Sequence, residues 1–375
     1  MPLLTDADRM QFRTWVRDAL EQLAPLDQTR ILAESGRRDD PALHGSLAEL
    51  GMFGLATPEE YGGGDVGAAG LAIFLMEAGR CLLPAPYLST AVLAPTAIRW
   101  AGAEKHFAEL LRGIAAGRAR VALAVSPSGD TALRAARDGQ FWQLTGAYPA
   151  VLEADVADWL IVAAETDTGP GLFVVDRHDA GVHIAALHSV DVARPVAAVT
   201  FTSAPGVALG DLDSAAALQA RLQDLVRLAI AADAVGGAQR LLDMSVEYAK
   251  ARVQFGRPIG SFQTIKHRCA DLFVAVQAAT AAVEGSFDHL DQTPGTTPVS
   301  VAVAAVCAHE ANWQAVRTAM QIHGGLALTW EHEVQLYLKR MTASQHLLGN
   351  PDHELARLTD LVLAANYDVV REIIG

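Results

Sequence analysis

The hydrophobic pattern divides the chain into three regions. Before about residue 118, the segments 9–23, 43–52 and 68–82 carry apolar residues three and four positions apart, which predicts helices. After residue 118, short runs rich in Val, Phe and Trp alternate with Gly, Pro, Asp and Ser, which is typical of strands joined by turns. Helical spacing returns from about residue 213, so the predicted order is helical, then β, then helical.

The third region is predicted to contain four long helices joined by short breaks. The breaks are the glycine- and proline-bearing segments RVQFGRPIG, DQTPGTTP and HGGLALTWE. Long helices with short connections favour an up-and-down bundle. The predicted helices cover residues 214–250, 261–288, 297–322 and 352–373.

We therefore expect an α+β protein of three domains. An N-terminal α-helical domain covers residues 1–117, a middle β-domain covers 118–212, and a C-terminal four-helix bundle covers 213–375. Hydrophobic residues make up 51% of the chain and charged residues 19%, a composition that supports large buried cores and argues against disorder.

Charge and hydropathy argue against two classes of partner. The net charge of −14, without any cluster of Lys and Arg, argues against nucleic acid. The apolar stretch 224–238 contains Arg227 and Asp233 and is too short to span a bilayer. The N-terminal residues lack the basic and apolar segments of a signal peptide, so we expect a protein without a membrane span.

The cysteines and histidines predict neither a disulfide framework nor a metal site. Cys81, Cys269 and Cys307 are few and far apart, which is typical of reduced thiols in a cytoplasmic protein. None of the twelve histidines lies in a zinc-binding pattern with cysteine or a carboxylate.

Two of the breaks in the third region carry candidate chemistry. RVQFGRPIGSFQ, residues 252–263, is polar and glycine-broken, although packing between apolar helices does not require such a joint. QIHGGLALTWEHE, residues 321–333, ends a later helix with a pair of glycines. Taken singly, the first could be an ordinary helix break with a surface arginine, and Gly324 with Gly325 could be a simple helix C-cap.

Taken together, these segments resemble the acyl-CoA dehydrogenase family over nearly the whole chain. Residues 252–263 are similar to the family pattern R-x-x-F-G-x-x-I-x-x-F-Q, and residues 321–333 to Q-I-x-G-G-x-G-x-x-x-E. PEEYGG, residues 58–63, resembles a loop of the family's N-terminal helical domain, and Arg340 stands at the place of a family arginine. The resemblance implies the acyl-CoA dehydrogenase fold, whose domain order matches the predicted one.

The resemblance also implies FAD as the cofactor and an acyl-CoA thioester as the substrate. In the family, a carboxylate removes the α-proton while the β-hydride goes to the flavin, and the FAD lies at a subunit interface, which implies an obligate oligomer. A guanidinium suits the pyrophosphate, and glycine lets backbone approach a phosphate closely. The implied FAD contacts are Arg252, Gln254 and Phe255 at the pyrophosphate and adenosine, and Gln321, Gly324 and Gly325 at the ADP part.

The position of the catalytic base departs from the family pattern. Counting from Arg340 places Gly349 where many members have glutamate, and Val226 occupies the alternative position. Asp233 lies two helical turns after Val226 on the same face of an apolar helix, where burial would raise its pKa and suit it to proton abstraction. We therefore name Asp233 as the candidate base, with an ion pair between Asp233 and an arginine elsewhere as the alternative.

The part that would hold the flavin ring also departs from the family. VSPSGDTAL places Ser126 near a family threonine, and the following segment puts Ala150 at the tryptophan and Leu152 at the hydroxyl that would bond flavin N5. Ala327 replaces a second glycine, which is a mild change. The sequence therefore keeps the ADP half of the site and weakens the ring half.

This division resembles the shorter, degenerate subunit of actinobacterial α2β2 acyl-CoA dehydrogenases of the steroid side-chain type. LLPAPYLSTAVLA, residues 82–94, is also similar to that subset. The leading hypothesis is a subunit that oxidises a bulky acyl-CoA to the 2,3-enoyl-CoA with a homologous partner, with an electron-transfer flavoprotein as acceptor. The alternatives are a homotetramer with Asp233 as its own base, a non-catalytic subunit that completes a partner's FAD site, and a helical scaffold without ligand.

Overall fold

The computed structural model describes residues 5–125, 132–139, 141–292, 297–347 and 351–364. Its contacts divide it into two compact units. The helical unit comprises Met1–Asp27, Ala68–Leu83 and Arg227–Gly375, and the mixed unit comprises Gln28–Gly67 and Pro84–Val226.

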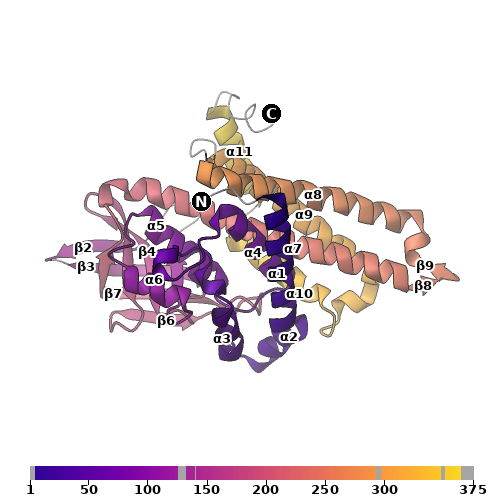
Figure 1. Ribbon diagram of the computed structural model, residues 1–375, viewed down its shortest axis with the longest axis horizontal. Coiled ribbons are helices and arrows are strands. Elements are labelled where there is room, and N and C mark those ends of the chain that lie inside the picture. Colours follow the sequence, from indigo (N-terminus) through magenta and orange to yellow (C-terminus); the bar gives the residue numbers. More distant parts are fainter. Residues whose placement is uncertain (1–4, 126–131, 140, 293–296, 348–350, 365–375) are drawn as a thin grey trace. The chain divides into compact units, whose positions relative to one another are not determined.

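Long helices build the helical unit (Figure 1). Within it, α9 packs against α8, α10 and α11. The helix bounds are α1 Asp6–Leu23, α4 Gly67–Arg80, α7 Ala215–Ala251, α8 Gln263–Gln292, α9 Thr297–His323, α10 Val334–Leu347 and α11 Pro351–Ala364. Helix α7 begins in the mixed unit and belongs to the helical unit from Arg227 onward.

Helix α1 begins at a capping box, and an ion pair holds it to α4 within the helical unit. The Thr5 hydroxyl accepts from the Asp8 N–H, and the Asp8 carboxylate accepts from the Thr5 N–H, which satisfies donors that a helix start leaves unpaired. Arg17 then bonds the buried Glu77 of α4 through two nitrogens, the Nη2–Oε1 distance being 2.8 Å. The ion pair therefore joins α1 to a helix 60 residues further along the chain.

Helices α4 and α7 approach each other so closely that their backbones touch. A Cβ atom added at Gly236 would lie 1.8 Å from the Met76 carbonyl oxygen, and one at Gly79 would lie 2.0 Å from the Asp233 carbonyl oxygen. Neither contact leaves room for a side chain larger than hydrogen. The glycines therefore fix α7 at the turn that carries Asp233.

The mixed unit is built around a sheet that closes on itself. The pairings run β4–β2–β3–β7–β5 and return to β4, while β1 pairs with β4 and β6 pairs with β7. Apolar residues from all the paired strands fill the interior, and the buried Tyr148 hydroxyl donates to the Ala163 carbonyl at 2.6 Å. The strand bounds are β1 Val121–Ala124, β2 Arg134–Asp138, β3 Phe141–Leu152, β4 Trp159–Thr166, β5 Gly169–Asp176, β6 Val182–Ala186 and β7 Val196–Ala208.

Short helices complete the mixed unit. They include a π-helical turn, Leu88–Leu93, which leads directly into α5 and whose Ser89 N–H donates to the buried Glu153 carboxylate at 2.9 Å. The PEEYGG loop forms a 3-10 turn at Glu59–Tyr61, and Gly63 fits against the Thr57 carbonyl where a Cβ would lie at 1.9 Å. The α-helices are α2 Leu26–Ser35, α3 Pro41–Glu49, α5 Ala94–Trp100 and α6 Ala108–Ala115.

The predicted fold class is confirmed: helical segments come first, strands follow, and helices return. The division into three domains at residues 117 and 212 stays a prediction. Helix α10 and strands β2 and β6 are absent from the sequence prediction, and the end of the predicted helix 352–373 lies beyond the described residues. Within the described ranges, no helix is both long and apolar enough to cross a membrane.

Candidate cofactor site

The joint between α7 and α8 is a tight β-hairpin. Strands β8 (Val253–Gln254) and β9 (Arg257–Pro258) pair across the two-residue turn Phe255–Gly256. Both turn residues have positive φ, +53° and +76°, which is the backbone of the hairpin turns that match strand twist. For a phenylalanine this conformation costs about 1–2 kcal/mol, because its Cβ crowds the backbone.

Phe255 is held in this turn with 91% of its surface exposed. Its ring meets Phe262 edge-on at 6.1 Å between centroids, and the Arg257 guanidinium lies 4.1 Å from the centroid of the Phe262 ring. An exposed aromatic ring in a strained turn gains nothing from the chain's own core. Such a ring is suited to a contact with a ligand or a second subunit.

The side chain of Arg252 is exposed and uncommitted. Its backbone N–H bonds the Tyr248 carbonyl at 2.8 Å, and its carbonyl accepts from the Ile259 N–H at 2.8 Å. Across the part of the chain that the structure describes, its guanidinium makes no hydrogen bond or ion pair, and the exposed amide of Gln254 makes no hydrogen bond. An anionic group such as a pyrophosphate therefore finds a free guanidinium here.

The end of α9 presents open backbone at Gly324 and Gly325. Gly324 has φ +62°, which ends the helix in the left-handed region that favours glycine. Built Cβ atoms at both positions have no neighbour within 4 Å, and the preceding Gln321 is exposed. The residues present thus fit a bound phosphate group, since the backbone at these glycines is open to a ligand and the hairpin supplies the uncommitted guanidinium of Arg252.

Aromatic side chains hold the two segments together at one end of the helical unit. The Tyr248 ring of α7 lies 4.5 Å from the His323 ring of α9, which lies 4.7 Å from the His332 ring just before α10. His323 Nδ1 lies 2.8 Å from the Ala319 carbonyl oxygen, and burial lowers the pKa of both histidines below 6.5. The lowered pKa values favour neutral rings at pH 7, and the three rings pack through one tilted and one edge-on contact.

Asp233 lies in the core of the helical unit and is paired with Arg340. Arg340 Nη1 donates to Asp233 Oδ1 at 3.0 Å, and the two residues are 4% and 1% exposed. The ion pair joins α7 to α10 and corresponds to the alternative stated above, in which Asp233 pairs with an arginine. The catalytic role of Asp233 stays a prediction, and this geometry favours a structural one.

The ring half of the site is only partly described. Ser126 and Gly349 lie outside the described residues, so their predicted places are untested. Ala150 is exposed on β3, Leu152 is half-buried on the same strand, and Val226 is half-buried on α7. None of these three side chains carries a group that can move a proton or donate a hydrogen bond.

A second buried ion pair lies next to Val226 and is not predicted from the sequence. Arg227 Nε donates to Glu354 Oε1 at 2.9 Å, and both side chains are less than a tenth exposed. Glu354 lies in the first turn of α11, in the segment PDHE. Acidic residues in the first turn of a predicted helix are the signal that could have identified it.

Comparisons with known proteins agree with this architecture. Residues 6–118 match the family model "Acyl-CoA dehydrogenase, N-terminal domain", and residues 217–360 match "Acyl-CoA dehydrogenase, C-terminal domain". The chain is 36% identical to "Acyl-CoA dehydrogenase IpdE2" of Mycolicibacterium smegmatis, over 94% of this chain and 97% of that protein.

Two solved structures are similar over nearly their full length. One is described as the "Tcur3481-Tcur3483 steroid ACAD", with a TM-score of 0.88, 28% identity, and 96% and 99% of the two chains covered. The other is the "ChsE4-ChsE5 complex from Mycobacterium tuberculosis", with a TM-score of 0.85, 28% identity, and 96% and 98% covered.

The chain therefore belongs to the acyl-CoA dehydrogenase family. Members of this family are FAD-dependent oxidoreductases that act on CH–CH groups.

Proposed function

We propose that this chain is a subunit of an FAD-dependent acyl-CoA dehydrogenase that oxidises a bulky acyl-CoA thioester to the 2,3-enoyl-CoA together with a homologous subunit. The observation that carries the proposal is the contrast between the two halves of the site. The segments around Arg252 and Gln321 match the family pattern and are open in the structure, whereas the resemblance puts Val226 and Gly349 at the two positions where family members carry the base.

The residues of this chain would bind and orient the cofactor. Arg252 would pair with the pyrophosphate, the backbone at Gly324 and Gly325 would approach the phosphates, and Phe255 would cover the adenosine. Bound FAD supplies the acceptor for the β-hydride of the thioester. The carboxylate that removes the α-proton would come from the partner, because Asp233 is engaged with Arg340.

The outer face of α8 supports an assembly with a second subunit. Phe273 and Val274 are 53% and 66% exposed in the middle of this helix, and the hairpin adds Val253 and Phe255 at its start. Exposed apolar groups in this number on one helix and its joint are typical of a subunit interface. One similar structure is described as a complex of two proteins, which supports a heteromeric arrangement.

Two further parts of the proposal concern the acceptor and the compartment. An electron-transfer flavoprotein would reoxidise the flavin, as the family resemblance implies. A cytoplasmic location agrees with the three free cysteines, of which Cys81 is buried with its pKa raised to about 12 by burial and is therefore an unreactive thiol.

A second candidate function is a non-catalytic subunit that completes the FAD site of a catalytic partner and stabilises it. The Asp233–Arg340 ion pair favours this candidate, since a carboxylate held by a buried arginine is a poor base. The two candidates differ in whether any substrate atom meets this chain.

The test is the flavin content per chain, measured by absorbance together with mass in solution. Purified alone, the chain should carry little or no FAD; co-expressed with a homologous subunit, the complex should carry about half a flavin per chain. One FAD per chain in a homotetramer made of this chain alone would contradict the heteromeric proposal. A complex that loses FAD but stays assembled with Arg252→Ala would support the ADP role of the hairpin.

A further inference from the structure

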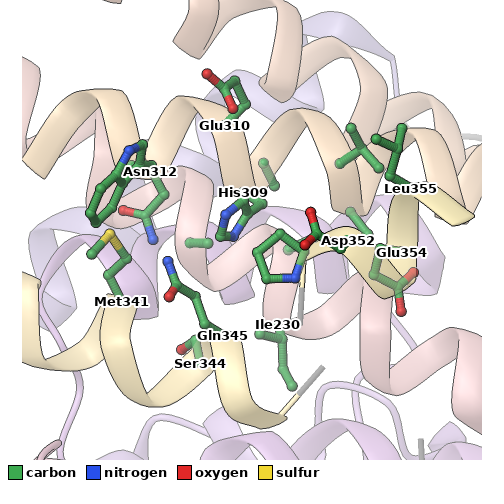
Figure 2. A pocket seen from close by; sticks show the side chains of 17 residues that line it. Ile230, His309, Glu310, Asn312, Met341, Ser344, Gln345, Asp352, Glu354 and Leu355 are labelled. Atoms are coloured by element: carbon green, nitrogen blue, oxygen red, sulfur yellow. The ribbon is translucent and has the colours of Figure 1, made fainter. Parts of the chain in front are cut away.

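A cavity of about 340 Å³ lies in the helical unit between α7, α9, α10 and α11 (Figure 2). Neither the ADP segments nor Asp233 lines it, so it is separate from the cofactor contacts proposed above. Its volume falls within the roughly 300–1,000 Å³ typical of small-molecule sites.

Small side chains on two facing helices form the apolar part of the cavity. Because alanines stand where larger residues would fill the space, the bundle is underpacked at this level. Ile230, Met341 and Trp313 add larger apolar surface at its ends. The alanines are Ala231 and Ala234 on α7 and Ala305 and Ala308 on α9.

Polar groups without partners face this apolar surface. Asn312 is only 7% exposed, yet within the described ranges its amide makes no hydrogen bond, nor do the side chains of Gln345 and His309. Figure 2 shows the Asn312 and Gln345 amides turned toward one another, with the His309 ring beside them. None of these groups is among the buried side-chain atoms without a partner, so they reach the space of the cavity, where the hydrogen-bonding group of a bound molecule would take the place of water.

The charges around the cavity select against anions. Asp352 and Glu354 line its α11 side, and no lysine or arginine is among the described lining residues. Arg227 compensates Glu354 at 2.9 Å, and burial lowers the pKa of His309, so the imidazole offers one donor and one acceptor at pH 7. A phosphate or carboxylate would therefore face carboxylates at the cavity wall, with no lysine or arginine among the described lining residues to bind it.

We propose that this cavity binds a compact, uncharged hydrocarbon that carries a hydroxyl or ketone oxygen. The hydrocarbon body contacts the alanines of α7 and α9, and the oxygen bonds the amides of Asn312 and Gln345. The site lies within one chain and requires neither FAD nor a second subunit, so it goes beyond the proposed function.

The experiment compares three probes that share one compact body and differ in charge. Adamantan-1-ol, adamantane-1-carboxylate and 1-adamantylammonium are titrated into the full chain by calorimetry and ligand-observed NMR. The alcohol should bind with one site per chain and at least tenfold more tightly than the carboxylate. No binding of the alcohol, or tighter binding of either charged probe, would overturn the proposal.

Variants locate the site. Asn312→Leu keeps the side-chain volume but removes the amide, and should weaken alcohol binding at least fivefold; Ala234→Phe should abolish it by filling the cavity. Gln22→Leu, at an exposed position of α1, is the matched control and should bind as the wild type does. Unchanged binding by both cavity variants would place the alcohol elsewhere. If either variant does not fold, the comparison of the three probes on the wild type still decides.

Discussion

The middle of helix α7 and the joint that follows it hold charged side chains in opposite environments. Near the middle of α7, Asp233 is almost fully buried and forms an ion pair with Arg340. After its last turn, Arg252 is exposed and, across the described ranges, pairs with no carboxylate. The difference separates charges that hold the chain together from charges available to a ligand, and it can be tested by substitution.

The largest expected effect comes from breaking the Asp233–Arg340 pair. Asp233→Asn or Arg340→Leu leaves one buried charge uncompensated and should lower the free energy of unfolding by about 3–5 kcal/mol. The double variant Asp233→Leu with Arg340→Leu should recover most of this loss. Urea unfolding of all three variants measures it. A stable Asp233→Asn protein that assembles, holds flavin and has lost turnover would instead make Asp233 the base.

Glu153 tests whether a buried carboxyl in the mixed unit also contributes to folding stability and not to ligand binding. Burial raises its pKa from 4.5 to about 7, so the folded chain keeps a proton that the unfolded chain loses. The stabilisation is complete below pH 4.5 and is lost as the pH rises toward 7, by about 3 kcal/mol in total.

The measurement for Glu153 is the melting temperature between pH 5 and pH 8. Glu153→Gln stays uncharged, keeps an oxygen for the Ser89 N–H, and should make the melting temperature of the variant fall less than that of the wild type over this range. Parallel curves for the two proteins would show that Glu153 titrates normally.

Gly236 tests how firmly Asp233 is placed. Gly236→Ala puts a Cβ against the Met76 carbonyl and should cost about 1–3 kcal/mol of unfolding free energy through overpacking. Gly285→Ala is the matched control, because it lies in α8 with no neighbour within 4 Å and should stabilise the helix by about 0.4–1 kcal/mol. Equal effects of the two substitutions would mean that α4 can move away from α7.

Arg252 should show the smallest effect on stability and a selective effect on the cofactor. Arg252→Ala should change the free energy of unfolding by less than about 0.5 kcal/mol, because the side chain touches little. In the assembled complex it should weaken FAD binding by about 1.5–3 kcal/mol, while Arg252→Lys keeps the charge and loses the fork. Fluorescence titration with FAD measures the affinity of both variants. Full flavin affinity in Arg252→Ala would remove the hairpin from the site.

The sequence predicts elements well where burial follows one period. Helices α7, α8 and α9 were predicted because their apolar spacing is long and their joints contain glycine or proline. Strand β2 was missed because RAARD buries only Ala135, since its other side chains face solvent beside β3. Helix α10 was missed because it follows the GGLALTWE joint closely and its moderate pattern has no separate start signal.

The candidate site divides in the same way. The two segments predicted to bind the ADP part of FAD are local patterns, so the sequence names Arg252 and Gln321 as candidates. The partner of Asp233 is 107 residues away, and Glu354 is 127 residues from Arg227. Pairings over such separations follow from helix packing, which residue types and spacing alone do not specify.

The closed sheet of the mixed unit limits how this protein can assemble. Among the described residues of this sheet, each strand in the ring β4–β2–β3–β7–β5 has a neighbour on both sides, although β2 meets β4 only at Arg134 and Glu165. Unpaired strand edges therefore remain on β1 and β6, which branch from the ring, and on the rest of β2. Few strand edges are therefore free to pair with the backbone of another subunit. The closed ring also limits aggregation through such edges. Recognition between subunits is left to side chains, where a few substitutions can turn a self-associating surface into one that prefers a different partner.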